Sequence, residues 1–327
     1  MKLFKGKNQV YSILIKVAIL GLLIFALYKQ LIGNSDVKSA LQLMLESINS
    51  NDFLLLFSVT ILMLLNWGVE SYKWKNIISK IYNIPFIQAF KAVWTGVTLG
   101  LFTPNRIGEY GGRILYLPMR HRISSIIATL IGSFGQIVVT STIGIITLII
   151  FLLTQTIFDT YITWMLIGIC IVLDIVFFAA YFNLHIFIEV FKRKKFFSRI
   201  LPYITIIGSY HNQDLWRYLG LSAIRYSVFT AQYLAFLKLF GVHLNVGEGV
   251  LVIGLIFLAQ TIIPSFAIAE LFTRGNIAVY FCGFYSENTV GVFAASTCLW
   301  LLNLIIPAIL GYTFIIKKNF LKQTGNE

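Results

Sequence analysis

The sequence has few charged residues and few cysteines, and each scarcity excludes a class of protein. Only 12% of its 327 residues are charged, about half the share of a soluble domain, while 58% are hydrophobic and the mean hydropathy is +0.82. This composition excludes a disordered chain and argues against a soluble enzyme. The cysteines, Cys170, Cys282 and Cys298, form no CxxC pair, so we expect neither a disulfide framework nor a metal site, and no cofactor.

The chain also lacks a P-loop, a nucleophile elbow, an HExxH sequence and a DxD sugar-nucleotide motif. What remains is an all-α polytopic membrane protein with a single membrane domain of about six transmembrane helices. We predict spans at Val10–Ile32, Phe53–Trp74, Ile123–Phe158, Tyr161–Asn183, Tyr218–Phe240 and Thr289–Ile316. The uncharged window Ile123–Phe158 exceeds one span, and we interpret it as one long tilted helix. The alternative is a hidden helical hairpin, which would invert everything downstream.

Two apolar segments are shorter and contain glycine. Phe86–Phe102 runs into TPNRIGEYGGR (Thr103–Arg113), and Val246–Ile263 runs into PSFAIAELFTR (Pro264–Arg274). Short segments interrupted by Gly and Pro are typical of broken or re-entrant helices. We therefore predict two re-entrant elements, at about 86–113 and 246–274.

The net charge of +13 comes from 26 Lys and Arg against 13 Asp and Glu. In a soluble protein this excess would suggest nucleic acid, but cytoplasmic loops of membrane proteins collect basic residues, so no nucleic-acid partner is expected. With both short segments re-entrant and both termini cytoplasmic, 20 basic residues fall in cytoplasmic segments and four outside. The same arrangement predicts an inverted repeat, with one copy in residues 1–158 and the other in 159–327.

Each motif carries a Glu four residues before an Arg, and inverted repeats place substrate sites near the midplane where the copies meet. Because Arg binds phosphate bidentately, we predict a phosphate or phospholipid headgroup site. The candidate substrate-binding residues are Arg106, Glu109, Arg113, Glu270 and Arg274. The alternative is that the Glu–Arg pairs are intrahelical ion pairs that only neutralise charge near lipid.

Further residues shape the motifs or lie within spans. A proline can end the apolar segment that enters the membrane, and glycine permits tight turns of the backbone or close packing of helices. The residues with these roles are Pro104, Gly108, Gly111, Gly112 and Pro264. Arg120 and Arg122 are also explained by the excess of positive charge on cytoplasmic loops. Asp174 and Arg225 lie at similar depth in neighbouring spans, so we predict an intramembrane charge pair, functional or structural. We expect Glu70 at an interface.

The motifs TPNRIGEYGGR and IPSFAIAELFTR (Ile263–Arg274) resemble the flippase-like transmembrane region of the lysylphosphatidylglycerol synthase family, over essentially the whole chain. The resemblance implies a bacterial or archaeal plasma-membrane protein that handles membrane lipids, either anionic phospholipids or polyprenyl phosphates. Longer members carry an aminoacyl-transferase domain that this sequence lacks, so lysyl transfer is not expected. Ala267 and Ala269 stand where the family commonly has glycines.

We therefore expect a lipid flippase-like protein that binds or translocates an anionic lipid by rocking one repeat against the other. One alternative is a membrane enzyme or accessory factor in polyprenyl-phosphate-linked glycosyl transfer, which should have carboxylates converging with arginines on an open pocket. Another is a scaffold that transports nothing. No oligomeric state is predicted.

Overall fold

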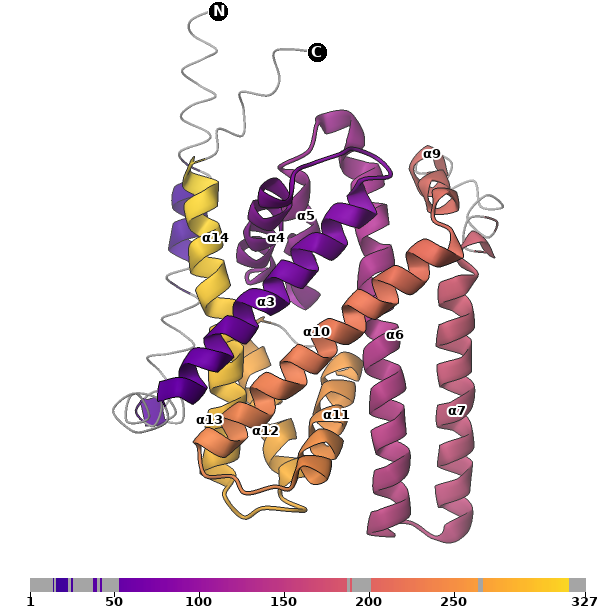
Figure 1. Cartoon of the computed structure of the whole chain (residues 1–327), viewed down its shortest axis with the longest axis vertical. Helices are drawn as coiled ribbons and strands as arrows, with labels where there is room; N and C mark the ends of the chain where they lie inside the picture. The colour runs from indigo at the N-terminus through magenta and orange to yellow at the C-terminus, as the bar shows by residue number, and fades with distance from the viewer. Residues whose placement is uncertain are drawn as a thin grey trace, which may run out of the picture.

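The computed structural model describes residues 14, 16–22, 25, 38–39, 42, 53–186, 189, 201–263 and 267–317, apart from the side chains at 104, 267–270 and 272. The described residues form helices and connecting turns with no strand, which confirms the predicted all-α fold (Figure 1). Among the described residues, four helical segments are long and apolar enough to cross a membrane, namely Phe53–Ile78, Met119–Gln155, Thr160–Phe182 and Thr289–Lys317. The predicted first span, Val10–Ile32, lies largely outside the described residues.

The uncharged window forms one uninterrupted helix, α6 (Arg122–Gln155), rather than a hairpin. The last span is also continuous, from α13 (Thr289–Trp300) through a π-helical turn, η5 (Leu301–Ile305), into α14 (Ile306–Lys317). A π-helical turn inside an α-helix is uncommon and is frequently found at functional sites.

The remaining long helices are α3 (Phe53–Ile78), α7 (Thr160–Phe182) and α10 (Asn212–Leu239). Helix α10 begins before the predicted Tyr218 because Asp214 caps it, accepting a hydrogen bond from the His211 backbone N–H at 3.1 Å. Helix α10 is long enough to span a membrane, but it is less apolar than the four segments named above. The count of six full spans therefore stays a prediction.

The first short segment forms a helical hairpin, α4 (Phe86–Gly100) and α5 (Gly108–Ile114). Gln88 Nε2 donates to the Tyr116 carbonyl at 2.7 Å, so the two ends of the hairpin lie together. The turn between the helices contains η1 (Pro104–Arg106) and two consecutive left-handed residues, Asn105 with φ 48° and Arg106 with φ 56°.

The second short segment forms another hairpin, α11 (Val246–Ile262) and α12 (Ala267–Cys282). Asn288 Nδ2 donates to the carbonyls of Phe240 at 3.0 Å and Gly241 at 3.2 Å, which joins the chain after α12 to the chain before α11. Figure 1 shows the α4–α5 hairpin in the upper half of the molecule and the α11–α12 hairpin in the lower half.

Each hairpin packs against a long helix from the other half of the sequence. Helix α4 contacts α14, where Thr98 Oγ1 donates to the Ala308 carbonyl at 2.8 Å, and α11 contacts α6. Glycines permit these approaches: a Cβ at Gly254 would meet the Thr147 side chain, and one at Gly144 would meet Leu258. Helices α3 and α10 cross in front of the hairpins (Figure 1). The two halves of the sequence therefore interlock.

Candidate functional site

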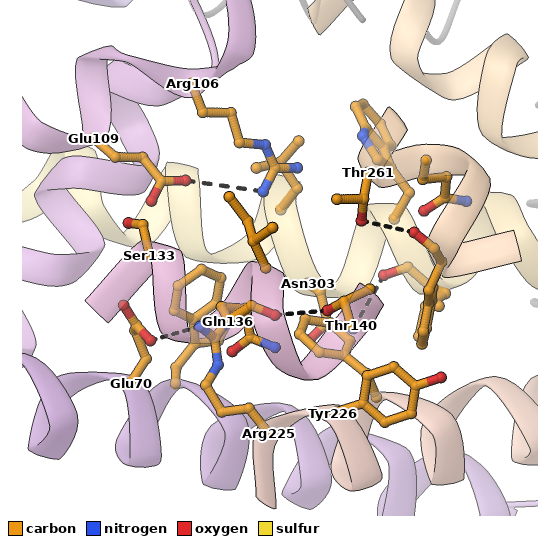
Figure 2. A pocket seen from close by; sticks show the side chains of 18 of the residues that line it. Glu70, Arg106, Glu109, Ser133, Gln136, Thr140, Arg225, Tyr226, Thr261 and Asn303 are labelled. Carbon is orange, nitrogen blue, oxygen red and sulfur yellow. Dashed lines mark hydrogen bonds and ion pairs between the residues drawn. The ribbon is translucent and has the colours of Figure 1, made fainter. Parts of the chain in front are cut away.

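A cavity of about 370 Å³ lies between the two hairpins, walled by α3, α6, α10 and α13 (Figure 2). Its charged lining residues, among those whose side chains the structure describes, are Glu70, Lys73, Arg106, Glu109, Arg113, Arg225 and Arg274. Five of these are cationic and two are acidic, a formal excess of three positive charges within the described lining. The rest of the lining is polar or aromatic and includes Trp67, Gln136, Tyr233, Phe257 and Trp300.

The first sequence motif supplies one wall of the cavity. Arg113 Nη2 lies 3.2 Å from Glu109 Oε2, and Arg106 Nη1 lies 3.9 Å from Glu109 Oε1. Gly96 of α4 allows α5 to approach, because a Cβ there would meet the Glu109 carbonyl and the Arg113 side chain. The intrahelical Glu–Arg pair does form, but it forms in the cavity wall rather than on a lipid-facing surface.

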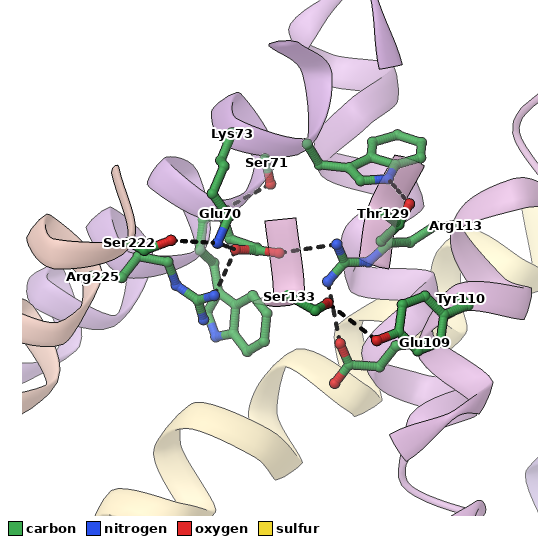
Figure 3. Close-up of polar contacts among 12 residues, drawn as sticks. Glu70, Ser71, Lys73, Glu109, Tyr110, Arg113, Thr129, Ser133, Ser222 and Arg225 are labelled. Atoms are coloured by element: carbon green, nitrogen blue, oxygen red, sulfur yellow. Dashed lines mark hydrogen bonds and ion pairs between the residues drawn. The ribbon is translucent and has the colours of Figure 1, made fainter. Parts of the chain in front are cut away.

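Glu70 has partners that were not predicted from the sequence. We expected it at an interface with no partner named, and it is 5% exposed and binds three cations at once (Figure 3). Its carboxylate lies 2.9 Å from Lys73 Nζ, 2.9 Å from Arg113 Nη1 and 2.6 Å from Arg225 Nη1. Helix α3 thus ties α5 of the first hairpin to α10 of the second half. A charged residue within a predicted span was the available signal.

The second motif reaches the same cavity through Arg274 of α12, whose Nη1 donates to Gln260 Oε1 at 2.9 Å. The structure therefore brings together Arg106, Glu109, Arg113 and Arg274, which the sequence places on two distant motifs. Pro264 and the side chain of Glu270 lie outside the described residues, so their roles stay predictions.

The predicted pairing of Asp174 with Arg225 is wrong. Arg225 donates to Glu70 and, through Nε, to Asn66 Oδ1 at 2.9 Å, while Asp174 accepts a hydrogen bond from Thr142 Oγ1 at 2.7 Å. Equal depth in the membrane was a sound inference from helix rise, but it does not fix the direction in which a side chain leaves its helix. Arg225 faces α3 and Asp174 faces α6.

A directional chain of hydrogen bonds extends from Arg225 into the buried core. Asn66 Nδ2 donates to Asn303 Oδ1 at 3.4 Å, Asn303 Nδ2 donates to Gln232 Oε1 at 3.2 Å, and Gln232 Nε2 donates to the Val59 carbonyl at 3.0 Å. Asn303 lies in the π-helical turn and lines the cavity. This network was not predicted from the sequence, although amides within apolar spans are a usable signal.

Three buried N–H groups of lining residues have no acceptor within the described part of the chain. They are Nε1 of Trp67, Nε1 of Trp300 and Nε of Arg113. Such groups are rare in folded proteins. Within the same part of the chain, no three His, Cys, Asp or Glu side chains gather in a way that could hold a metal ion.

The glycines and proline of the first motif have different surroundings. A Cβ at Gly108 would meet the Leu99 carbonyl, and one at Gly112 would meet the backbone of Gly96, whereas Gly111 faces open space. Pro104 begins η1 at the turn of the hairpin. Close packing therefore requires glycine at two of the three predicted positions, Gly108 and Gly112.

Comparison with known proteins identifies one family. The family model described as Lysylphosphatidylglycerol synthase TM region matches residues 13–311, nearly the whole chain. No curated protein and no solved structure matches the chain.

Proposed function

The chain belongs to the lysylphosphatidylglycerol synthase transmembrane-region family, and we propose that its central cavity binds the headgroup of an anionic lipid, a phospholipid or a polyprenyl phosphate. The family match and the apolar helices together show that the chain is a multi-pass integral membrane protein. The observation that carries the proposal is the excess of cations in the described lining of the cavity, five against two carboxylates, inside a bundle of apolar helices.

An uncompensated buried charge is costly, so a cavity with this excess favours an anionic occupant. Arginine suits a phosphate because its planar fork donates two parallel hydrogen bonds. Arg106 and Arg113 come from the first hairpin and Arg274 from the second. A single headgroup could therefore contact both hairpins.

We further propose that residues 1–158 and 159–327 are inverted repeats that rock against each other to move the headgroup across the membrane. The hairpins in opposite halves of the molecule support this (Figure 1). So does the contact of η1, at the tip of the first hairpin, with α12 of the second. Rocking would open the cavity alternately toward each face, as in other transporters built from inverted repeats.

Purification with native lipids followed by mass spectrometry tests the binding. Arg113→Ala and Arg274→Ala should each lose the retained anionic lipid, whereas Arg120→Ala, an exposed arginine outside the cavity, should keep it. Arg113→Lys should recover only part of the binding because lysine lacks the bidentate fork. In the Arg113 variants Glu70 still contacts Lys73 and Arg225, so these variants should fold, with reduced stability.

Equal retention of anionic lipid by the wild type, Arg113→Ala and Arg274→Ala would contradict the proposal. So would the absence of any anionic lipid from the purified wild-type protein.

A second candidate is a membrane enzyme or accessory factor in polyprenyl-phosphate-linked glycosyl transfer. One observation favours it: Glu109 converges with Arg106 and Arg113 in the cavity, with its side chain 18% exposed. Incubation with a polyprenyl-phosphate sugar donor separates the two candidates. Turnover that Glu109→Gln abolishes without loss of lipid binding would support the enzyme, and retained lipid without turnover would support the carrier.

A further inference from the structure

We propose that the bound lipid ends in a phosphomonoester, a terminal phosphate of nearly two negative charges, and that its hydrocarbon chain leaves the cavity sideways past Ile137 of α6. This inference rests on the proposed binding of an anionic headgroup and narrows its chemical class. Three features of the cavity carry it: the charge balance, the guanidinium donors from both hairpins, and the position of a lining residue on the outer surface.

The charge balance favours a dianion. Glu70 and Glu109 offset two of the five lining cations and leave a formal excess of three. If Glu270 contributed a third carboxylate, the excess would still be two. A phosphodiester supplies one negative charge, whereas a terminal phosphate carries about 1.5 to 2 at pH 7. The phosphomonoester therefore leaves less uncompensated charge in the cavity.

The donor groups suit a phosphate with three free oxygens. The guanidinium groups of Arg106 and Arg113 come from the first hairpin and that of Arg274 comes from the second, so donors reach the cavity from two sides. A terminal phosphate has three acceptor oxygens, whereas a diester has only two that are not bridging. The phosphomonoester can therefore accept from more directions at once.

The position of Ile137 indicates a lipid rather than a free phosphate. Ile137 lines the cavity, yet it is 40% exposed near the middle of α6. Ile123 and Leu130 precede it at seven-residue intervals on the same helix face and are also exposed, at 45% and 48%. The cavity thus reaches the outer surface of a membrane-spanning helix, at a depth where a hydrocarbon chain is compatible and water is not.

A binding comparison between two lipids with identical acyl chains tests the inference. Dioleoyl phosphatidic acid and dioleoyl phosphatidylglycerol are titrated into the full-length protein in phosphatidylcholine nanodiscs, and the shift in melting temperature is recorded. At pH 7.5 phosphatidic acid should bind about tenfold more tightly, the effect of one additional favourable charge. The preference should shrink at pH 5.5, because the second phosphate pKa is about 6.

Two variants and a soluble competitor complete the design. Arg274→Gln and Arg106→Gln remove a cavity cation and should reduce the preference for phosphatidic acid. Lys91→Gln removes an exposed cation of α4 outside the cavity and should not. Glycerol 3-phosphate at millimolar concentration should not compete, because it lacks the hydrocarbon chain.

Each outcome is decisive for one claim. Phosphatidylglycerol binding as tightly as phosphatidic acid would overturn the phosphomonoester and leave the proposed function intact. Effective competition by glycerol 3-phosphate would overturn the lateral exit of the chain. Failure of both lipids to bind better than phosphatidylcholine would overturn the proposed function itself.

Discussion

The buried carboxylate of Glu70 contacts three cations, which come from α3, α5 and α10. Removing a member of a buried ion network leaves the remaining charges unpaired, which costs far more than the net contribution of the pairs themselves. Glu70 also provides negative charge to the cavity cations, as we propose for the lipid phosphate. The residue should therefore affect both stability and binding.

Glu70→Gln should lower the free energy of unfolding by about 3 kcal/mol, because three cations lose their shared carboxylate. Anionic lipid should raise the melting temperature of this variant more than that of the wild type, since it restores the missing charge. Glu287→Gln, which changes an exposed glutamate, is the matched control and should stay within about 0.5 kcal/mol of the wild type. An unchanged melting temperature for Glu70→Gln would show that the network contributes little.

The sequence predicted well which ionisable residues lie within helices, but it predicted poorly which way their side chains point. Arg225 was correctly singled out as an ionisable residue within a helix, but its partner proved to be Glu70 rather than Asp174. Helix rise fixes depth, whereas the rotation of a helix about its axis depends on tertiary packing. For the same reason, the sequence indicated Arg113 and Arg225 without indicating Glu70, the carboxylate that contacts both of them.

At the scale of elements, the α4–α5 hairpin depends on close backbone contact. Gly112 faces the backbone of Gly96 and Thr95, while Gly111, its neighbour in the same helix, faces open space. Gly112→Ala should destabilise the protein by about 1 to 3 kcal/mol, because the added methyl must push the helices apart. Gly111→Ala should be neutral or stabilising, since alanine favours a helix over glycine. Thermal unfolding of the two variants in one detergent would measure the difference. Equal stability would contradict this packing.

Elements were predicted well where one feature of the sequence dominated. The single helix α6 followed from an uncharged window too short for two spans, and the breaks after α4 and α11 followed from Gly and Pro in the short segments. That these two segments are re-entrant stays a prediction. The π-helical turn of η5 could not be foreseen, because LLNLI has no distinguishing pattern. The glycines signalled close packing, but which of them face another helix depends on tertiary arrangement.

At the scale of the whole molecule, the distribution of basic residues predicts the orientation in the membrane. In a variant without its native cysteines, Ser79→Cys after α3 should be shielded from a membrane-impermeant maleimide applied to intact cells. Thr160→Cys at the start of α7 should react; both positions are exposed. Permeabilised cells should label at both sites. The reverse pattern in intact cells would overturn the orientation, and labelling at both sites without permeabilisation would show mixed insertion.

The meeting of the two motifs in one cavity was predictable because they share a Glu–Arg spacing and were expected to enter from opposite faces. The contributions of α3 and the π-helical turn were not, because Glu70 and Asn303 lie in segments without a motif. A site assembled from several helices is only partly visible in any one stretch of sequence.

The central claim is that arginines from both hairpins bind one lipid headgroup and carry it across the membrane. Its most direct test is the transbilayer movement of a phosphatidic acid with a fluorescent acyl chain, followed in proteoliposomes by dithionite quenching. Wild type and Arg120→Ala should move the lipid well above the rate of protein-free vesicles, while Arg113→Ala and Arg274→Ala should fall to that background. Movement that is equal in all four proteins, or no faster in wild type than in protein-free vesicles, would contradict the account.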